Sequence, residues 1–586
     1  MKKGKTDTMA DSELNNFLIV AAIDFGTTYS GYAFSTKDEY RKDPVKISFN
    51  KPWNAESANL LSMKAPTCLL LNAKKEFVAF GYEAENKYSQ LVAEDDHEEY
   101  YFFYRFKMSL HNTKKLTKEL LIEDISGKSA LALDVFSLSI KALKEQILKT
   151  IFRQLKGINN EDICYVLTVP AMWRDSAKQF MRKSAEMAGI APDHLRIALE
   201  PEAASLYCQH IPVTKFEGTY TKLDTLGVGV KYMVVDLGGG TADITVHEKM
   251  NNGCLKELYR ATGSDCGGTS VDVAFFNLIE KIIGKPAKDS YIQHNLEDYL
   301  DFLRDFESLK RTIKPDKTGN VSMRIPVSSL NALCKQYYNS DFQSTVKDSS
   351  LSSVVSVQKD KIQIDAKTFI DLFTPTIRKI QKLINDTFQH ENAYGIETII
   401  LVGGFSECPL IKDAIKKEAE ERTVIFPHEN DLAVLKGAVI FGHCPQAIGE
   451  RIAKFTYGFG KRKKFDPTIH DQEHLDIVNG EEWCIHLFEK IVTRDNTIKI
   501  GQPIVTKAIS RPGEKFHCRL YQTEKYDPLY TDEEGCSLLG VITMNKSDIL
   551  NPIKIIVEFI FWDTEIGVKI KEKKTGKQCE GTIDML

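Results

Sequence analysis

The chain has 586 residues, too many for a single hydrophobic core, which indicates several domains. Its net charge of −4 and pI near 6.4 give no electrostatic reason to expect nucleic acid or an anionic membrane as a partner. The 12 cysteines form no Cys-x-x-Cys pair, which argues against a zinc site or a disulfide framework and favours the cytoplasm. No apolar run reaches the roughly 20 residues of a membrane helix, so we expect no membrane insertion.

The first recognisable motif is an acidic, glycine-containing turn near the N-terminus. Residues 1–16 are polar, and we expect them to be disordered. The apolar run Phe17–Ile23 then predicts a buried strand that ends at Asp24. Glycine has no Cβ and lets backbone N–H groups approach an anion, so we interpret the next residues as an anion-binding turn: Gly26, Thr27 and Thr28.

Two charged residues in the following third of the chain are candidates for a site. Lys107 follows an aromatic segment and could lie beside a phosphate, although a lone lysine is more often a solvated surface residue. Leu133–Leu155 has the apolar periodicity of a long helix. Glu200 ends a strand before Pro201, and this pattern fits a helix-entrance charge as well as a carboxylate in a cleft.

The stretch Met233–His247 repeats the first motif. An apolar run ends at Asp236, a glycine turn follows, and an alternating strand leaves it. Carboxylates on both arms of one turn repel each other unless a divalent cation lies between them. Two such hairpins can face each other across a cleft, so we predict a clamp for a magnesium nucleotide. The second half of the clamp would contain Gly238, Gly239, Gly240, Thr241 and Asp243.

The remainder of the chain continues the alternation of strands and helices and then changes character. A glycine-rich turn, Gly263–Thr269, precedes a helix expected near Val271, where an anion is favoured. The helix predicted at Leu296–Thr312 ends in mixed charges that would also suit a solvated face. Phe369–Phe388 is expected to be one helix. From Ile452 onward, short strand-like runs predict an antiparallel β domain.

Six ordered motifs together resemble a known family. They are Ile23–Ser30, Val169–Ser176, Glu200–Ala204, Asp236–Asp243, Phe306–Thr312 and Leu401–Gly404. This set is similar to the actin-like ATPase superfamily and, within it, to the heat shock protein 70 kDa family, most of all its divergent member-12-like branch. The resemblance covers nearly the whole chain.

The resemblance implies a fold and a domain organisation. The fold would be an α/β actin-like ATPase domain, with two duplicated halves around a nucleotide cleft, followed by a smaller antiparallel β-sandwich domain. We expect a tail at 1–16, the ATPase domain at 17–445, and a substrate or interaction domain at 446–586 that lacks a helical lid. The family's leucine-rich acidic linker has no counterpart around Gln446–Phe455.

The resemblance also implies site residues, with ATP or ADP and Mg²⁺ as cofactors. Asp24, Glu200 and Asp236 would hold the metal, mostly through water. The implied catalytic residues are Lys107, Glu200, Asp236, Thr241 and Asp243, the last orienting water or a monovalent cation such as K⁺. The nucleotide would contact Asp24, Gly26, Thr27, Thr28, Tyr29, Gly238, Gly239, Gly240, Thr241, Gly267, Gly268, Glu307, Lys310, Arg311, Lys314, Gly403, Gly404, Phe405 and Asp431. Lys314 and Phe405 depart from the family's serines, which leaves the effect on adenine affinity open.

The implied function is that of an ATP-binding, slowly ATP-hydrolysing chaperone-like protein. Its nucleotide state would control peptide or protein clients at the β domain, with co-chaperones or nucleotide exchange factors as further partners. One alternative is a non-hydrolysing, nucleotide-gated adaptor. A less favoured alternative is a small-molecule kinase of the same fold, because such an enzyme has no use for the C-terminal β domain.

Overall fold

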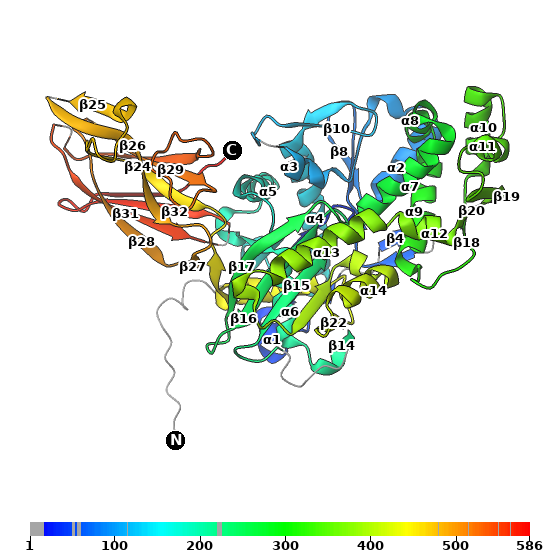
Figure 1. Ribbon diagram of the computed structural model, residues 1–586, viewed down its shortest axis with the longest axis horizontal. Helices are drawn as coiled ribbons and strands as arrows, with labels where there is room; N and C mark the ends of the chain where they lie inside the picture. Colours follow the sequence, from blue (N-terminus) through cyan, green and yellow to red (C-terminus); the bar gives the residue numbers. More distant parts are fainter. Residues whose placement is uncertain are drawn as a thin grey trace, which may run out of the picture. The chain divides into compact units, whose positions relative to one another are not determined.

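A computed structural model describes residues 17–49, 53–55, 60–113, 115–218, 226–478, 480–513, 515–548, 550–562 and 564–586 (Figure 1). The predicted tail at residues 1–16 lies outside this described part. The chain divides into two compact units. Unit 1 comprises Met1–Trp173, Met181–Thr245 and Thr262–Pro445, and unit 2 comprises Arg174–Phe180, Val246–Ala261 and Gln446–Leu586.

The first sheet of unit 1 is built around two fully buried strands. Its order is β13 (Leu195–Leu199), β12 (Ile163–Val169), β1 (Ile19–Phe25), β2 (Tyr29–Thr36) and β3 (Ser48–Phe49), with β6 (Ala65–Pro66) also paired to β2. β1 runs parallel to β12 and antiparallel to β2, with Asp24 opposite Gly31. Every residue of β1 and β12 is buried, which explains their unbroken apolar sequences.

A second sheet in unit 1 carries the central hairpin. The first five strands of this sheet follow the order β14 (Phe216–Gly218), β22 (Thr423–Pro427), β21 (Thr398–Val402), β15 (Lys231–Leu237) and β16 (Ala242–Lys249). β15 is parallel to β21, with Asp236 opposite Val402. This pairing brings the acid that ends β15 beside the glycines that follow β21.

Helices cover these sheets in Figure 1. The predicted helix at Leu133–Leu155 is confirmed as α4 (Ala132–Gln154), and α15 (Ala433–His443) packs on α6 (Glu200–His210). None of the described helices is long and apolar enough to cross a membrane. The other long helices are α2 (Tyr82–Ala93), α5 (Asp175–Met187), α7 (Gly268–Ile283), α8 (Lys285–His294), α9 (Leu296–Thr312), α10 (Val327–Tyr338) and α14 (Pro409–Glu418).

The single helix predicted at Phe369–Phe388 is wrong. The structure has α12 (Ala366–Asp371) followed by α13 (Thr374–Phe388). Pro375 lies in the first turn of α13, where its missing N–H costs nothing, whereas the interior of one continuous helix would need that N–H. Pro375 therefore marks the break between the two helices in the sequence itself.

Smaller elements complete unit 1. The short helices are α1 (Lys37–Lys42), α3 (Ser109–Asn112) and α11 (Phe342–Asp348). The remaining strands pair in small sheets: β4 (Trp53–Ala55), β5 (Leu60–Ser62), β7 (Cys68–Leu71), β8 (Phe77–Phe80), β9 (Tyr101–Tyr104), β10 (Leu121–Glu123), β11 (Ser129–Leu131), β18 (Asn320–Arg324), β19 (Val355–Gln358) and β20 (Lys361–Asp365).

Unit 2 is rich in antiparallel strands, as predicted for the chain after Ile452. One sheet has the order β25 (Leu475–Val478), β26 (Glu481–Val492), β24 (Thr456–Lys464), β29 (Lys515–Thr523) and β30 (Ser537–Asn545). The other has the order β28 (Pro503–Ile509), β31 (Lys554–Phe561), β32 (Ile566–Glu572) and β33 (Gln578–Thr582). Phe459 and Leu520 of the first sheet share a hydrophobic cluster with Val557 and Phe559 of the second. The unit also contains β17 (Leu255–Ser264) up to Ala261, β23 (Ile448–Ile452) and β27 (Thr497–Lys499).

The close packing of α15 on α6 gives a stability prediction. A Cβ added to Gly437 would lie 1.6 Å from the carbonyl oxygen of Ala203, so Gly437→Ala must force the helices apart. We expect it to lower the free energy of unfolding by at least about 2 kcal/mol, measured by denaturant titration. Gly404→Ala is the matched control, because its new Cβ would meet nothing within 4 Å. Equal stability of the two variants would contradict this account of the packing.

Candidate functional site

Unit 1 contains a cavity of about 250 Å³ that collects most of the predicted site residues. Its walls come from the turns after β1, β15 and β21 and from one face of α9. The predicted residues that line it are Asp24, Gly26, Thr27, Thr28, Tyr29, Lys107, Glu200, Asp236, Gly238, Gly239, Gly240, Thr241, Gly268, Glu307, Lys310, Arg311, Gly403, Gly404, Phe405 and Asp431.

The two glycine-threonine turns face each other at close range. A Cβ on Gly239 would lie 2.3 Å from Thr28 Oγ1, and one on Gly240 would lie 2.4 Å from Thr27 Oγ1. Only glycine therefore permits this approach of the two turns. Two hydroxyls and the N–H groups of a glycine turn converge on the cavity, which suits an anion with several oxygens, such as a phosphate chain.

Four carboxylates belong to the same buried cluster. Asp24, Glu200 and Asp236 line the cavity, whereas Asp243 does not, and its Oδ1 accepts the backbone N–H of Met172 at 2.8 Å. Burial, with Asp24 and Asp243 nearby, raises the pKa of Glu200 to about 7 despite the opposing charge of Lys107. Burial and the carboxylates of Glu200, Asp243 and Asp24 raise the pKa of Asp236 well above its usual range.

Two lysines neutralise part of this negative charge. Lys107 Nζ donates to Glu200 Oε1 at 2.8 Å and lies over the ring of Trp173 at 5.2 Å. Its 2% exposure rules out the solvated surface lysine that the sequence alone would favour. Lys64 Nζ donates to Asp24 Oδ2 at 2.7 Å. Although burial raises the pKa of Asp24, the charges of Lys64 and Lys107 outweigh it and hold that pKa below its usual value.

Glu200 fulfils both of the roles that its sequence left open. It is the first residue of α6, with Pro201 in the first turn, and its side chain also lines the cavity and pairs with Lys107. A carboxylate at a helix N-terminus is favoured by the helix dipole, and here the same group faces the cluster of acids.

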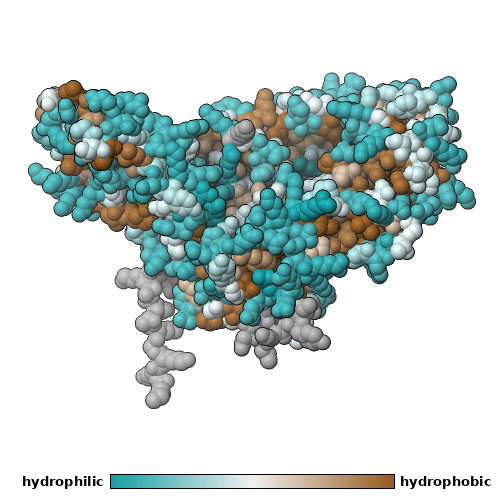
Figure 2. Space-filling model, in the orientation of Figure 1, coloured by the Kyte–Doolittle hydropathy of each residue, from teal (hydrophilic) through white to brown (hydrophobic). Residues whose placement is uncertain are grey.

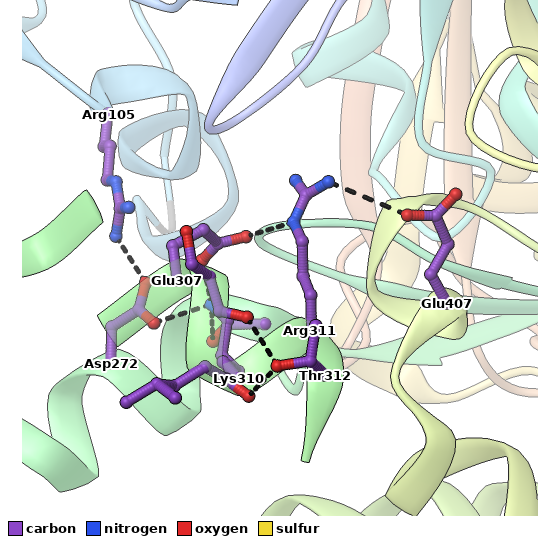
Figure 3. A network of polar contacts seen from close by, with 10 residues as sticks. Arg105, Asp272, Glu307, Lys310, Arg311, Thr312 and Glu407 are labelled. Atoms are coloured by element: carbon purple, nitrogen blue, oxygen red, sulfur yellow. Dashed lines mark hydrogen bonds and ion pairs between the residues drawn. The ribbon is translucent and has the colours of Figure 1, made fainter. Parts of the chain in front are cut away.

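The charged end of α9 forms an internal network, drawn in Figure 3. Lys310 Nζ donates to Asp272 Oδ1 at 2.6 Å and contacts Glu307. Arg311 Nε donates to Glu307 Oε1 at 2.9 Å, and Arg105 donates to Asp272 Oδ2 at 2.7 Å. Burial opposes ionisation of Glu307, but Lys310 and Arg311 lower its pKa to about 2. The alternative of a solvated helix face is therefore excluded for Glu307 and Lys310.

Three of the predicted site residues, one catalytic and two nucleotide-binding, do not line the cavity. Asp243 accepts the Met172 N–H, as described, and Gly267 supports the turn, since a Cβ there would lie 2.5 Å from Gly239 O. Lys314 is exposed, because α9 ends at Thr312 and the chain continues in an extended conformation at Ile313. Lys314 is therefore a correction to the predicted adenine contacts.

The structure adds lining residues that sequence reasoning did not select. They are Lys64, Tyr82, Thr269, Arg304, Ser308 and Val434. Arg304 and Ser308 lie on the same face of α9 as Glu307 and Arg311, so helical spacing from the motif would have found them. Lys64 lies between the short strands β5 and β6, where no periodic pattern marks it.

The residues of the cavity fit a nucleotide with a divalent cation. The facing turns offer anion-binding groups, and α9 with the Gly403 turn closes the cavity beyond them. Asp236 makes no ion pair with any lysine, arginine or histidine in the described part of the chain, although three carboxylates raise its pKa. An oxygen-ligated divalent cation beside Asp236 and Glu200 would relieve this repulsion.

Comparisons with known proteins agree with this assignment. A family model described as "Hsp70 protein" matches residues 112–451. The chain is 30% identical to "Heat shock 70 kDa protein 12A" of Homo sapiens over 98% of its own length and 92% of that protein. It is 30% identical to "Heat shock 70 kDa protein 12B" of Homo sapiens over 97% and 91% of the two chains. It is 25% identical to "Chaperone protein DnaK" of Thermosipho melanesiensis over 70% and 60%.

The raised pKa of Glu200 predicts how stability varies with pH. Its value of about 7 in the folded chain exceeds the ordinary 4.5, so the folded state binds this proton more tightly than the unfolded state. The contribution is full below pH 4.5 and is lost as the pH rises through 7, a change of up to about 3 kcal/mol.

Glu200→Gln should therefore reduce the loss of unfolding free energy between pH 4.5 and 7, measured by denaturant titration. The control is Glu83→Gln on the exposed face of α2, which should keep the wild-type dependence. Identical pH profiles for Glu200→Gln and the wild type would contradict the assignment.

Proposed function

Because the chain belongs to the Hsp70 family, we propose that it binds ATP, hydrolyses it slowly, and uses the nucleotide state to control clients at its C-terminal β domain. The observation that carries the proposal is the facing of two glycine-threonine turns across a cavity lined by Asp24, Glu200 and Asp236. Phosphoryl transfer requires mainly positioning and charge stabilisation, and this arrangement is suited to both.

The phosphate chain of ATP would lie between the two turns. Thr27 and Thr28 would donate their hydroxyls from one side, and the backbone of Gly239 and Gly240 would donate N–H groups from the other. Mg²⁺, held through water by Glu200 and Asp236 with Asp24 beside them, would supply charge neutralisation and alignment of the phosphates.

Three side chains would act on the transferred phosphate. Lys107, fixed by Glu200 at 2.8 Å, presents a positive charge to the cavity. Thr241 lines the cavity beside the glycine turn and would contact the terminal phosphate. Asp243 is held in orientation by the Met172 N–H and would accept a proton from the attacking water or orient that water through a monovalent cation.

The β strands of unit 2 would form a sandwich domain that binds peptide or protein clients. β28 is an edge strand of its sheet, and its Val505 and Ile509 are 56% and 69% exposed. An edge strand can pair with an extended peptide, while exposed apolar side chains contact that peptide's own side chains. Hydrophobic patches over the C-terminal strands, among mostly hydrophilic side chains in Figure 2, support this proposal.

Nucleotide control of such a domain is energetically feasible. A shift of a two-state equilibrium from 1:99 to 99:1 requires about 5.5 kcal/mol of differential binding. One terminal phosphate with its metal and charge-assisted hydrogen bonds is a sufficient source, because each such bond contributes about 1.5–3 kcal/mol.

Single-turnover hydrolysis of ATP with Mg²⁺ and K⁺ tests the proposal. We expect slow formation of ADP by the wild type and a loss of at least about 100-fold in rate for both Thr241→Ala and Asp243→Asn. Ser308→Ala is the matched control, because Ser308 lines the α9 side of the cavity and should leave the rate nearly unchanged.

The other outcomes separate the alternatives. Tight ATP binding without turnover by the wild type would overturn the ATPase and favour a nucleotide-gated adaptor. ADP formation that requires an added sugar would favour a small-molecule kinase. Equal rates for the wild type, Thr241→Ala and Asp243→Asn would remove these two residues from the mechanism.

Client binding is tested by fluorescence anisotropy with an apolar, extended peptide. Val505→Lys combined with Ile509→Lys should weaken binding at least about tenfold, because charges replace the apolar contacts on the edge strand. Ile469→Lys is the matched control, since Ile469 is similarly exposed, at 61%, but lies in a loop. Equal effects of the two changes would contradict binding at β28.

A further inference from the structure

Lys64 has a position that the catalytic arrangement proposed above does not use. Its Nζ donates to Asp24 Oδ2 at 2.7 Å and to the backbone carbonyl of Asp431 at 2.9 Å, and its side chain lines the cavity. Asp24 lies near the end of β1, in the N-terminal part of unit 1, and Asp431 precedes α15, in its C-terminal part. One ammonium group therefore links two segments that are far apart in sequence and that both line the cavity.

The backbone and packing around Lys64 hold it in this position. It directly precedes β6, in which Ala65 pairs with Ser30 and Pro66 pairs with Tyr29 of β2. Its aliphatic stem packs on Gly31, where an added Cβ would lie 2.9 Å from Lys64 Cγ. The side chain is only 17% exposed, so its charge faces the cavity rather than bulk solvent.

Lys64 competes with a metal ion for the same carboxylate. Thr168 donates to Asp24 Oδ1 at 2.7 Å, and Lys64 donates to Oδ2, so both oxygens already accept a strong hydrogen bond. Both partners of the Lys64 ammonium are oxygen acceptors, the carboxylate of Asp24 and the backbone carbonyl of Asp431, and such acceptors favour the charged amine. A fixed positive charge therefore occupies part of the place where a metal would neutralise phosphates and acids.

We propose that Lys64 is a resident cation of the nucleotide site, which supplies part of the charge neutralisation of a divalent metal and lets the cleft hold nucleotide when Mg²⁺ is scarce. The inference rests on the proposed nucleotide binding and deepens it. The four carboxylates face two ammonium groups, those of Lys64 and Lys107. With all four carboxylates ionised, loss of Lys64 would leave three more negative charges than positive ones beside an anionic ligand, so that nucleotide binding would depend more strongly on the metal.

Isothermal titration of the full chain with ATP, in excess Mg²⁺ and in EDTA, tests this role. For the wild type we expect the Kd to rise less than about tenfold when Mg²⁺ is removed. For Lys64→Met the same removal should raise the Kd at least about tenfold more than in the wild type, because no fixed cation replaces the metal. Lys64→Arg keeps the charge and should behave nearly as the wild type.

Two further variants control for structural effects. Lys87→Met removes a lysine from an exposed pair with Glu83, 2.7 Å long, and should leave the Mg²⁺ dependence unchanged. Lys64→Gln is neutral but retains a hydrogen-bond donor toward Asp24, so it serves as the second test should Lys64→Met fail to fold. It should show the same increased dependence on Mg²⁺.

The outcomes distinguish this inference from the proposed function. Normal ATP binding in Mg²⁺, with the same Mg²⁺ dependence in the wild type, Lys64→Met and Lys64→Gln, would overturn the role of Lys64 and leave nucleotide binding intact. Absence of ATP binding by the wild type in Mg²⁺ would overturn both. A structural role alone would lower the thermal stability of the variants without changing the ratio of their two Kd values.

Discussion

Repulsion among buried carboxylates is the constraint on which the site depends. Four acids meet at the ends of strands and at the start of a helix, where water cannot screen them well. Lys64 and Lys107 each neutralise one of them, and the pKa of Asp24 falls while those of Glu200 and Asp236 rise. The remaining negative charge favours a ligand that carries a bound cation. A metal nucleotide has such a cation, whereas a bare phosphate does not.

Local patterns in the sequence were sufficient for the two turns and their strands. Apolar runs ending in Asp24 and Asp236 predict β1 and β15, because buried parallel strands need unbroken apolar sequences. The contact between the turns depends on glycine, which the sequence displays directly. The break at Pro375 was equally visible, and the prediction of one helix gave the apolar periodicity too much weight.

The features of the site that the sequence did not reveal depend on contacts between residues far apart in the chain. Lys64 reaches Asp24 because β6 pairs with β2, and β6 has only two residues, too few to show a recognisable pattern. The resemblance to the family placed Lys314 at the adenine, but α9 ends before it and its side chain is exposed. From the sequence alone, the charged end of α9 would also suit a solvated face, because Asp272, the partner of Lys310, lies on α7, far away in sequence. Within that network Lys310 is buried, whereas the side chain of Arg311, paired with Glu307 and Glu407, is 40% exposed.

The hydrogen bond from Met172 N–H to Asp243 Oδ1 has a consequence for observing the protein at work. An amide proton exchanges with solvent only when its hydrogen bond opens, and the strength of this bond depends on the charge of its acceptor. Deuterium uptake at Met172 therefore reports on the state of Asp243. A single backbone position, followed by hydrogen–deuterium exchange without any substitution, would report on changes at a carboxylate next to the cavity.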